Sequence, residues 1–282
     1  MALESGAYGF RLVAPALEAG LPDLVPLGGD APEVTVVWRH ASMAIDREQV
    51  EAESVCVGAR QGSGFEALRE PLSIALDLPY EVSPEALVHP LLTVPISVLA
   101  RWRGDVTLHA GAFAAEGAAW GVVGAREAGK STMLASLGRR GVPVVADDLL
   151  AVLDGVAWSG PACVDLRPDA AEHIDGARYL GEVGRRPRYR LSTPPSPAKL
   201  PLRGLFLLGW NDGAAVEDHL LNAKDRLELL YRQEYIGLLG PADPQRILDL
   251  MALPAWRVTR PRDWGATDSV CDRILKLCAD YS

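Results

Sequence analysis

The chain has 282 residues, of which 49% are apolar and 23% are charged. This balance excludes a disordered, a collagen-like or a small disulfide-rich chain, and it is typical of a soluble globular protein of one or two domains. The 28 Lys and Arg against 37 Asp and Glu give a net charge of −9. We therefore expect no nucleic-acid partner, because phosphates would repel so acidic a chain.

The cysteines and the N-terminal residues bear on the compartment. The four cysteines are far apart and form no C-x-x-C pair, so they predict neither a zinc site nor a disulfide framework. The chain starts without a basic segment before an apolar one, and its longest mainly apolar stretch, residues 91–100, is too short to cross a bilayer. We expect a cytoplasmic protein with reduced thiols and no membrane contact.

The first part of the chain favours strands. Turn residues separate strand-like segments at residues 8–14, 34–40, 55–60 and 73–78. An apolar segment of helical length follows at residues 91–102 and ends at Arg103-Gly104. The sequence therefore predicts a β-rich N-terminal domain of unknown role over residues 1–103 and a second domain over residues 104–282.

From residue 106 the pattern becomes that of an α/β protein. Strands are predicted at residues 106–109, 111–114 and 119–123, with a hairpin turn at Glu116-Gly117. A helix at residues 131–139 and strands at 142–146 and 149–153 follow. This order of strand, loop, helix and strand is typical of a nucleotide-binding core.

A glycine-rich motif lies between the strand at 119–123 and the helix at 131–139. Residues 124–131, GAREAGKS, match the phosphate-binding pattern G-x-x-x-x-G-K-[ST] in the strand-loop-helix context that it needs. Lys130 is expected to reach the β- and γ-phosphates and Ser131 to hold Mg²⁺. A glycine-rich turn with an exposed lysine is the alternative. The predicted nucleotide-binding residues are Gly124, Ala128, Gly129, Lys130, Ser131 and Thr132.

Two acidic residues and a histidine flank the motif. Asp147 and Asp148 end the strand after the helix, where an acidic side chain would face the phosphates. Phosphoryl transfer uses carboxylates to hold the metal and to accept the proton of the attacking hydroxyl. An ordinary polar strand end is the alternative. His109 ends an apolar strand, a pattern that by itself favours a buried structural histidine.

The C-terminal part contains a basic stretch over residues 185–203. No acidic residue interrupts its charges, which are Arg185, Arg186, Arg188, Arg190, Lys199 and Arg203. Its prolines predict a long loop, either a mobile one that faces an acidic substrate or a solvated charge run without a partner. A strand at 204–208 and helices at 224–235, 244–251 and 268–279 are predicted to follow.

Four short runs carry a resemblance to a known family. They are LHAG at 108–111, GVVG with GKST over 121–132, RRG at 139–141 and VADD at 145–148. In order and spacing they resemble the catalytic domain of HPr kinase/phosphorylase. The likeness extends weakly through residues 166–171, which are similar to HPr-kinase-like kinases of biosynthetic gene clusters, including lasso-peptide precursor kinases. It does not cover the first hundred residues.

The resemblance implies a P-loop-containing α/β core like that of HPr kinase and phosphoenolpyruvate carboxykinase, with ATP and Mg²⁺ as cofactors. It implies transfer of the γ-phosphate to a hydroxyl, often that of a serine. By position, Asp147 matches the general base, His109 the histidine beside it and Lys130 the nucleotide-binding lysine. Ser131 and Asp148 match the residues near the metal.

Two departures from the family pattern affect these expectations. Glu127 occupies a position where the family usually has Gly, and a carboxylate close to phosphate is repulsive unless it points outward or contacts a metal or Arg126. The glycine-rich segment that HPr kinases use for phosphorylase action is absent. We therefore expect neither dephosphorylation nor HPr as the substrate.

The sequence thus predicts a kinase for a serine of a peptide or protein, such as a natural-product precursor peptide, contacted by the basic residues 185–203. A kinase for a small hydroxyl compound is one alternative. A non-catalytic ATP-binding protein that regulates or scaffolds a partner is the other, with Glu127 as the mark of a degenerate loop. HPr kinases form hexamers, but nothing in this sequence specifies a homo-oligomer.

Overall fold

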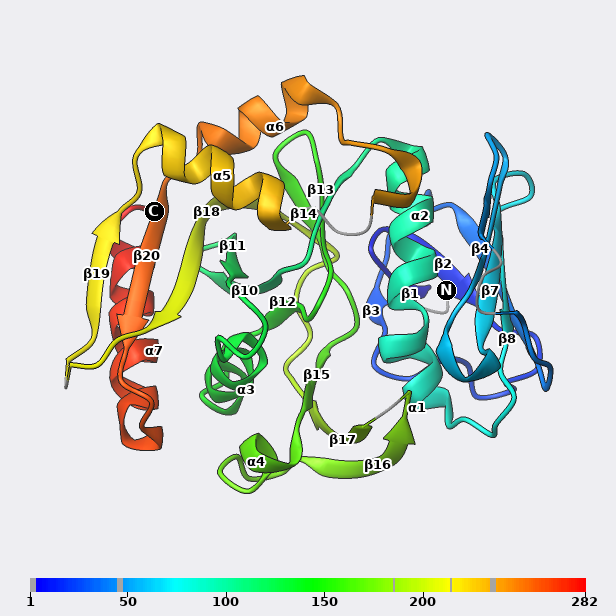
Figure 1. Cartoon of the computed structure of the whole chain (residues 1–282), viewed down its shortest axis with the longest axis horizontal. Helices are drawn as coiled ribbons and strands as arrows, with labels where there is room; N and C mark the ends of the chain where they lie inside the picture. The colour runs from blue at the N-terminus through cyan, green and yellow to red at the C-terminus, as the bar shows by residue number, and fades with distance from the viewer. Residues whose placement is uncertain (1–3, 45–47, 185, 214, 234–236) are drawn as a thin grey trace.

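The structure, a computed structural model, describes residues 4–44, 48–184, 186–213, 215–233 and 237–282. These residues form a mixed α/β fold with three sheets. Figure 1 shows the N-terminal sheet at one side of the molecule and the larger sheet with its helices at the other. Helix α2 (Thr93–Arg103) stands between the two.

The N-terminal sheet has the strand order β3-β1-β2-β4-β8-β7-β6-β5. Its strands are β1 (Ser5–Ala7), β2 (Phe10–Val13), β3 (Val25–Pro26), β4 (Glu33–Arg39), β5 (Glu48–Val50), β6 (Ser54–Gly58), β7 (Gly64–Leu68) and β8 (Ser73–Asp77). The strands predicted at 8–14, 34–40, 55–60 and 73–78 are confirmed as β2, β4, β6 and β8. The other four strands were not predicted, and three of them have only two or three residues.

A helical segment connects this sheet to the rest of the chain. It consists of α1 (Pro84–Ala86), η2 (Leu87–Leu91) and α2, and α2 confirms the predicted helix. The helix ends at Gly104, whose φ of 100° is the left-handed conformation that glycine adopts after a helix. Side chains of the N-terminal sheet, of α2 and of the second sheet belong to one apolar cluster. The division between residues 103 and 104 stays a prediction.

The second sheet has the order β12-β10-β11-β18-β14-β13-β9, and β20 lies between β18 and β19. Its strands are β9 (Val106–Leu108), β10 (Gly111–Ala115), β11 (Ala118–Val123), β12 (Val144–Ala146), β13 (Leu150–Leu153), β14 (Val156–Trp158), β18 (Lys199–Trp210), β19 (Glu217–Leu220) and β20 (Ala255–Arg260). Strands β11, β18 and β20 are parallel. Their carboxyl ends therefore meet at one edge of the sheet, where the residues that follow them gather.

Helices cover both faces of this sheet. Helices α3 (Lys130–Arg139) and α7 (Thr267–Asp280) pack with Phe113, Trp120 and Phe206 of the sheet. Helices α5 (Ala223–Gln233) and α6 (Pro244–Met251) belong to the other apolar cluster. The helices predicted at 131–139, 244–251 and 268–279 are confirmed. The one predicted at 224–235 reaches Gln233, and its last two residues lie outside the described residues.

The third sheet overturns one expectation. It has the order β15-β17-β16, from β15 (Cys163–Leu166), β17 (Arg186–Ser192) and β16 (Arg178–Val183), and α4 (Pro168–Ala171) follows β15. The predicted loop over 185–203 is therefore wrong, because β17 and the start of β18 occupy most of it. Arg185 lies outside the described residues. Every second residue of β17 from 186 to 190 is an arginine, and this is the two-residue period of a strand.

Two further observations concern the cysteines and the helices. All four cysteines are buried and free. Among the described residues no helix is long and apolar enough to cross a membrane. The 3₁₀ turns within the described residues are η1 (Arg60–Gly62), η3 (Gly237–Leu239) and η4 (Trp264–Ala266).

Candidate active site

The glycine-rich loop leaves β11 at the carboxyl edge of the sheet and enters α3. Gly124, Glu127 and Gly129 all have positive φ, at 151°, 67° and 81°. A Cβ on Gly124 would lie 2.9 Å from the Leu208 carbonyl oxygen, and one on Gly129 would collide with the Arg260 guanidinium. Glycine is therefore needed at both ends of the loop, as the motif requires.

Lys130 is the first residue of α3. Its Nζ donates to the carbonyl oxygens of Gly124 at 2.9 Å and of Ala125 at 3.4 Å. Burial lowers the pKa of Lys130, and the charges of Asp148 and Asp147 oppose this shift. The ammonium group is thus held against the loop, in the place where the motif predicts phosphate.

Glu127 lines the cavity in front of the loop and pairs with Arg167. Its Oε1 accepts from Arg167 Nη1 at 2.7 Å, and its carbonyl oxygen accepts from Trp210 Nε1 at 3.2 Å. The hydrogen bond and charge of Arg167 lower the pKa of Glu127. The partner is therefore Arg167, although the sequence suggested Arg126. The backbone at this position is left-handed, a conformation that glycine adopts more readily than glutamate does.

The loop forms one wall of a cavity of about 700 Å³. Trp210 and Trp264 also line it; the Arg260 guanidinium stacks over Trp210 at 4.1 Å, and His173 stacks on Trp264 at 4.0 Å. Of the predicted site residues, those that line the cavity are His109, Ala128, Gly129, Lys130, Ser131, Thr132 and Asp148. Gly124 and Asp147 do not line it.

Asp147 follows β12 and is only 4% exposed. Its Oδ1 accepts from the Ser131 hydroxyl at 3.0 Å, and its Oδ2 accepts from the backbone N–H of Asp165 at 3.1 Å. Burial, and next the charge of Asp148, raise the pKa of Asp147 to about 8. Asp147 is therefore a buried side chain behind Ser131 and faces no open cleft.

Asp148 has the opposite position. Its φ of 65° turns the chain after the strand ends, and its side chain lines the cavity. The His109 side chain hydrogen-bonds with the backbone of Asp148, and burial lowers the pKa of His109. Of the two neighbouring aspartates, Asp148 with His109 thus faces the space in front of the loop.

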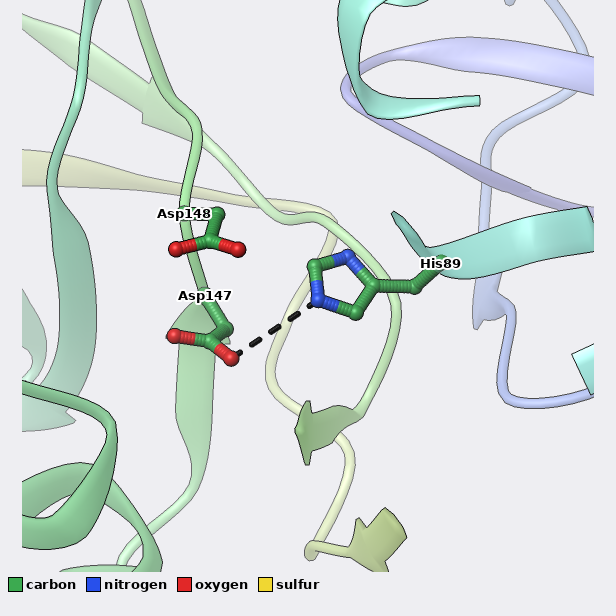
Figure 2. A group of neighbouring side chains, drawn as sticks. All are labelled: His89, Asp147 and Asp148. Carbon is green, nitrogen blue, oxygen red and sulfur yellow. Dashed lines mark ion pairs between the residues drawn. The ribbon is translucent and has the colours of Figure 1, made fainter. Parts of the chain in front are cut away.

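His89 is a site residue that sequence reasoning missed. Within η2 its backbone is extended, with φ −152° and ψ 126°, as expected for a residue before proline. Its Nε2 lies 3.7 Å from Asp147 Oδ2 and 3.9 Å from Asp165 Oδ2, and Figure 2 shows the ring turned toward Asp147 and Asp148. Burial lowers the pKa of His89, against the charge of Asp165. No sequence pattern joins this histidine to the distant motif.

Arg190 fastens the segment that carries His89 to the third sheet. Its Nε donates to Asp165 Oδ1 at 2.7 Å, its Nη2 to the His89 carbonyl oxygen at 2.5 Å and its Nη1 to that of Glu85 at 3.0 Å. Burial opposes the ionisation of Asp165, but the charges of His89 and Arg190 outweigh it and lower the pKa of Asp165. Arg190, which the sequence placed in a basic stretch open to substrate or solvent, is instead an internal ion-pair partner. In the sequence, only the arginine at every second position of β17 could have indicated this.

Comparisons with known proteins give a distant likeness among solved structures. No family model matches the chain, and no curated protein matches it. Among solved structures the chain is similar to the HPr(Ser) kinase/phosphatase from Coxiella burnetii, with 13% identity and a TM-score of 0.30. The match covers 62% of this chain and 98% of that one.

Proposed function

We propose that the chain is an ATP-dependent kinase that transfers the γ-phosphate of ATP to a hydroxyl group. The observation that carries the proposal is the pairing of two walls across one cavity. The glycine-rich loop with Lys130 forms the first wall, and Asp148 with His109 belongs to the second. Such a cavity offers a phosphate site and a proton acceptor to the same reacting group.

The phosphates would bind at the loop and at the N-terminus of α3. Backbone N–H groups at a helix start attract anions, and the lysine adds a full positive charge. Lys130 would exchange its bonds to the Gly124 and Ala125 carbonyl oxygens for phosphate oxygens. The charge that develops on the transferred group is then stabilised by a donor already in place.

Ser131 is placed to hold the Mg²⁺ that accompanies ATP. Its hydroxyl donates to Asp147, so its lone pairs stay available for a cation, and it lines the cavity. Magnesium accepts few protein oxygen ligands and keeps waters and phosphate oxygens. When bound, it would neutralise phosphate charge. Asp147 then acts as a positioning residue for Ser131.

We assign the proton acceptor to Asp148, although the family resemblance implies Asp147. Both oxygens of the buried Asp147 accept hydrogen bonds from Ser131 and Asp165, whereas Asp148 faces the cavity. The acceptor oxygen would form a bond to the γ-phosphorus as the bond to the ADP oxygen breaks. Its proton passes to the Asp148 carboxylate. His109, hydrogen-bonded at the Asp148 backbone, holds that segment in place.

For the acceptor we keep a serine of a peptide or protein. Arg188 and Arg190 are occupied by Asp165, so of the arginines in β17, Arg186 is the one that lines the cavity. Arg126 and Arg262 line the cavity with it. These three guanidinium groups would attract an acceptor with a carboxylate near its hydroxyl.

The test is transfer of label from γ-labelled MgATP. Purified protein is incubated with extract of its source cell, beside Lys130→Ala and the exposed control Lys224→Ala. We expect label in peptide or protein with the wild type and the control, and none with Lys130→Ala. Label in small molecules instead would show that the acceptor is a small hydroxyl compound and not a peptide or protein. ATP binding without any transfer would contradict the kinase and favour a regulatory nucleotide-binding protein.

A further inference from the structure

His89 is a buried polar side chain whose second ring nitrogen has no partner. The residue is 1% exposed, and its Nε2 has no hydrogen-bond partner among the described residues. Leaving such an atom unpaired costs free energy, so an orphaned nitrogen calls for an explanation. The two nearest carboxylates, at 3.7 and 3.9 Å, are too far for a hydrogen bond.

The other ring nitrogen orients the imidazole. His89 Nδ1 lies 3.2 Å from the Thr93 hydroxyl. In the tautomer that carries its proton on Nδ1, Thr93 accepts that proton's hydrogen bond and Nε2 keeps a free lone pair. A ring fixed in this way, with its free nitrogen aimed at carboxylates, is the arrangement found for histidines that ligate metals.

The carboxylates near Nε2 divide into paired and unpaired ones. Asp165 already receives Arg190 and Arg188. Within the described part of the chain, neither Asp147 nor Asp148 forms a salt bridge with an arginine or lysine. Two adjacent carboxylates repel each other when both are ionised. A cation between them and His89 would remove this repulsion.

The distances suit an ion. One ligand atom each from His89, Asp147 and Asp148 lie within 4.8 Å of one another. Ligands at about 2.1 Å from a metal lie roughly 3 to 3.6 Å apart at ordinary coordination angles, close to the 3.7 Å between His89 Nε2 and Asp147 Oδ2. A small inward shift of the side chains would therefore complete the site.

We propose that His89, Asp147 and Asp148 form a binding site for a divalent transition-metal ion that is distinct from the Mg²⁺ of ATP. An imidazole nitrogen beside two carboxylates favours Mn²⁺, Co²⁺ or Zn²⁺ over Mg²⁺. One oxygen of Asp148 can bind this ion while the other faces the cavity. The ion joins the η2 segment to the strand end at Asp147 and keeps both aspartates ionised. The proposal shares Asp147 and Asp148 with the proposed kinase site, but neither nucleotide nor transfer is needed to test it.

The experiment uses Mn²⁺ alone with the full-length, nucleotide-free protein. Binding is measured by electron paramagnetic resonance, and spin-echo modulation detects nitrogen coordinated to the bound ion. We expect one bound Mn²⁺ with nitrogen modulation, and little displacement by excess Mg²⁺. His89→Gln should lose the modulation and weaken Mn²⁺ binding about ten-fold or more.

Two control variants make the result specific. His40→Gln removes an exposed histidine and should change nothing. His109→Gln removes the other imidazole near Asp148 and should keep the nitrogen signal. Loss of that signal in His109→Gln, its persistence in folded His89→Gln, or absence of nitrogen modulation in the wild type would each overturn the proposal.

The readouts also separate this proposal from the kinase. Phosphoryl transfer with Mg²⁺ and without nitrogen-coordinated Mn²⁺ would overturn the ion site alone. Nitrogen-coordinated Mn²⁺ in a protein that transfers no phosphate would overturn the kinase alone. If circular dichroism shows that His89→Gln does not fold, the ion site is tested by Mn²⁺ binding to the wild type, to His109→Gln and to Asp148→Asn. The last of these should bind Mn²⁺ more weakly, and unchanged binding would count against the site.

Discussion

The two walls of the cavity are built in opposite ways. The loop wall comes from one continuous stretch, residues 124–132, and it offers mainly backbone groups and one lysine. The acid wall is lined by Asp148 and Asp165 and is supported from behind by Asp147, His89 and Arg190, so its residues come from four separate segments of the chain. Local geometry suffices for the first wall, whereas the second exists only when its segments pack together. Substitutions in the two walls should therefore have different effects on nucleotide binding, phosphoryl transfer and stability.

The largest effect is expected where the acid wall faces the cavity. Asp148→Asn should slow phosphoryl transfer by about 10²–10⁴-fold, because the variant cannot accept the proton. ATP affinity should stay unchanged or rise, because a negative charge near the phosphates is lost. Single-turnover transfer and nucleotide titration measure the two effects separately.

The matched variant is Asp147→Asn. It should weaken MgATP binding, since Asp147 holds the Ser131 hydroxyl. The opposite pattern, with transfer abolished and MgATP affinity intact in Asp147→Asn, would restore Asp147 as the base and refute the assignment to Asp148.

The next effect concerns the ion pair behind the acid wall. Arg190→Met should lower the free energy of unfolding at neutral pH by about 3–5 kcal/mol, because Asp165 is left as a buried, unpaired charge. In the wild type the pKa of Asp165 is lowered. Its ionised form therefore stabilises the fold above the pKa of the unfolded chain, and this contribution is lost as the pH falls through the lower folded pKa. The loss in the variant should accordingly shrink as the pH falls and Asp165 takes up a proton.

Urea unfolding at neutral and at acidic pH measures this dependence. The control Arg69→Met removes an exposed ion pair with Glu53 and should change stability by no more than about 0.5 kcal/mol. An equal loss for Arg190→Met at both pH values would show that its effect is one of packing and not of charge.

A smaller effect is expected where the two walls meet. Ser131→Ala removes the hydroxyl that bonds to Asp147 and should weaken MgATP binding about ten-fold, while binding of metal-free ATP changes little. Ser136→Ala, in the same helix, removes a hydroxyl bonded only to the Thr132 carbonyl oxygen. Calorimetric titration should therefore give a weaker MgATP affinity for Ser131→Ala than for Ser136→Ala. Equal affinities would show that Ser131 does not hold the metal.

The smallest effect belongs to the loop wall. Glu127→Gln should raise ATP affinity severalfold, because a carboxylate near phosphate is repulsive and Arg167 is released from its pair. Glu127→Gly should raise affinity similarly and also melt at a higher temperature than the Gln variant, since glycine adopts the positive φ without strain. Weaker nucleotide binding in both variants would mean that the Glu127–Arg167 pair supports the loop.

Local features were predicted well. The strand before the glycine-rich loop, the loop and α3 follow from apolar periodicity and glycine positions within a short stretch, and the turn at Glu116-Gly117 has positive φ at both residues. The basic stretch was predicted wrongly, because arginines and prolines suggested a solvated loop. Asp165 and Asp23 neutralise Arg188 and Arg190, and this allows β17 to lie in a sheet.

By itself the sequence determined the glycine-rich loop, the lysine and serine at the start of α3 and the acidic pair at the end of β12, because these depend on residues close in the chain. Tertiary structure decided which aspartate faces the cavity, that Glu127 turns to Arg167 and that His89 reaches Asp147. These outcomes depend on burial and on charges from distant segments. Such electrostatic relations exist only after packing has excluded water and brought the segments together.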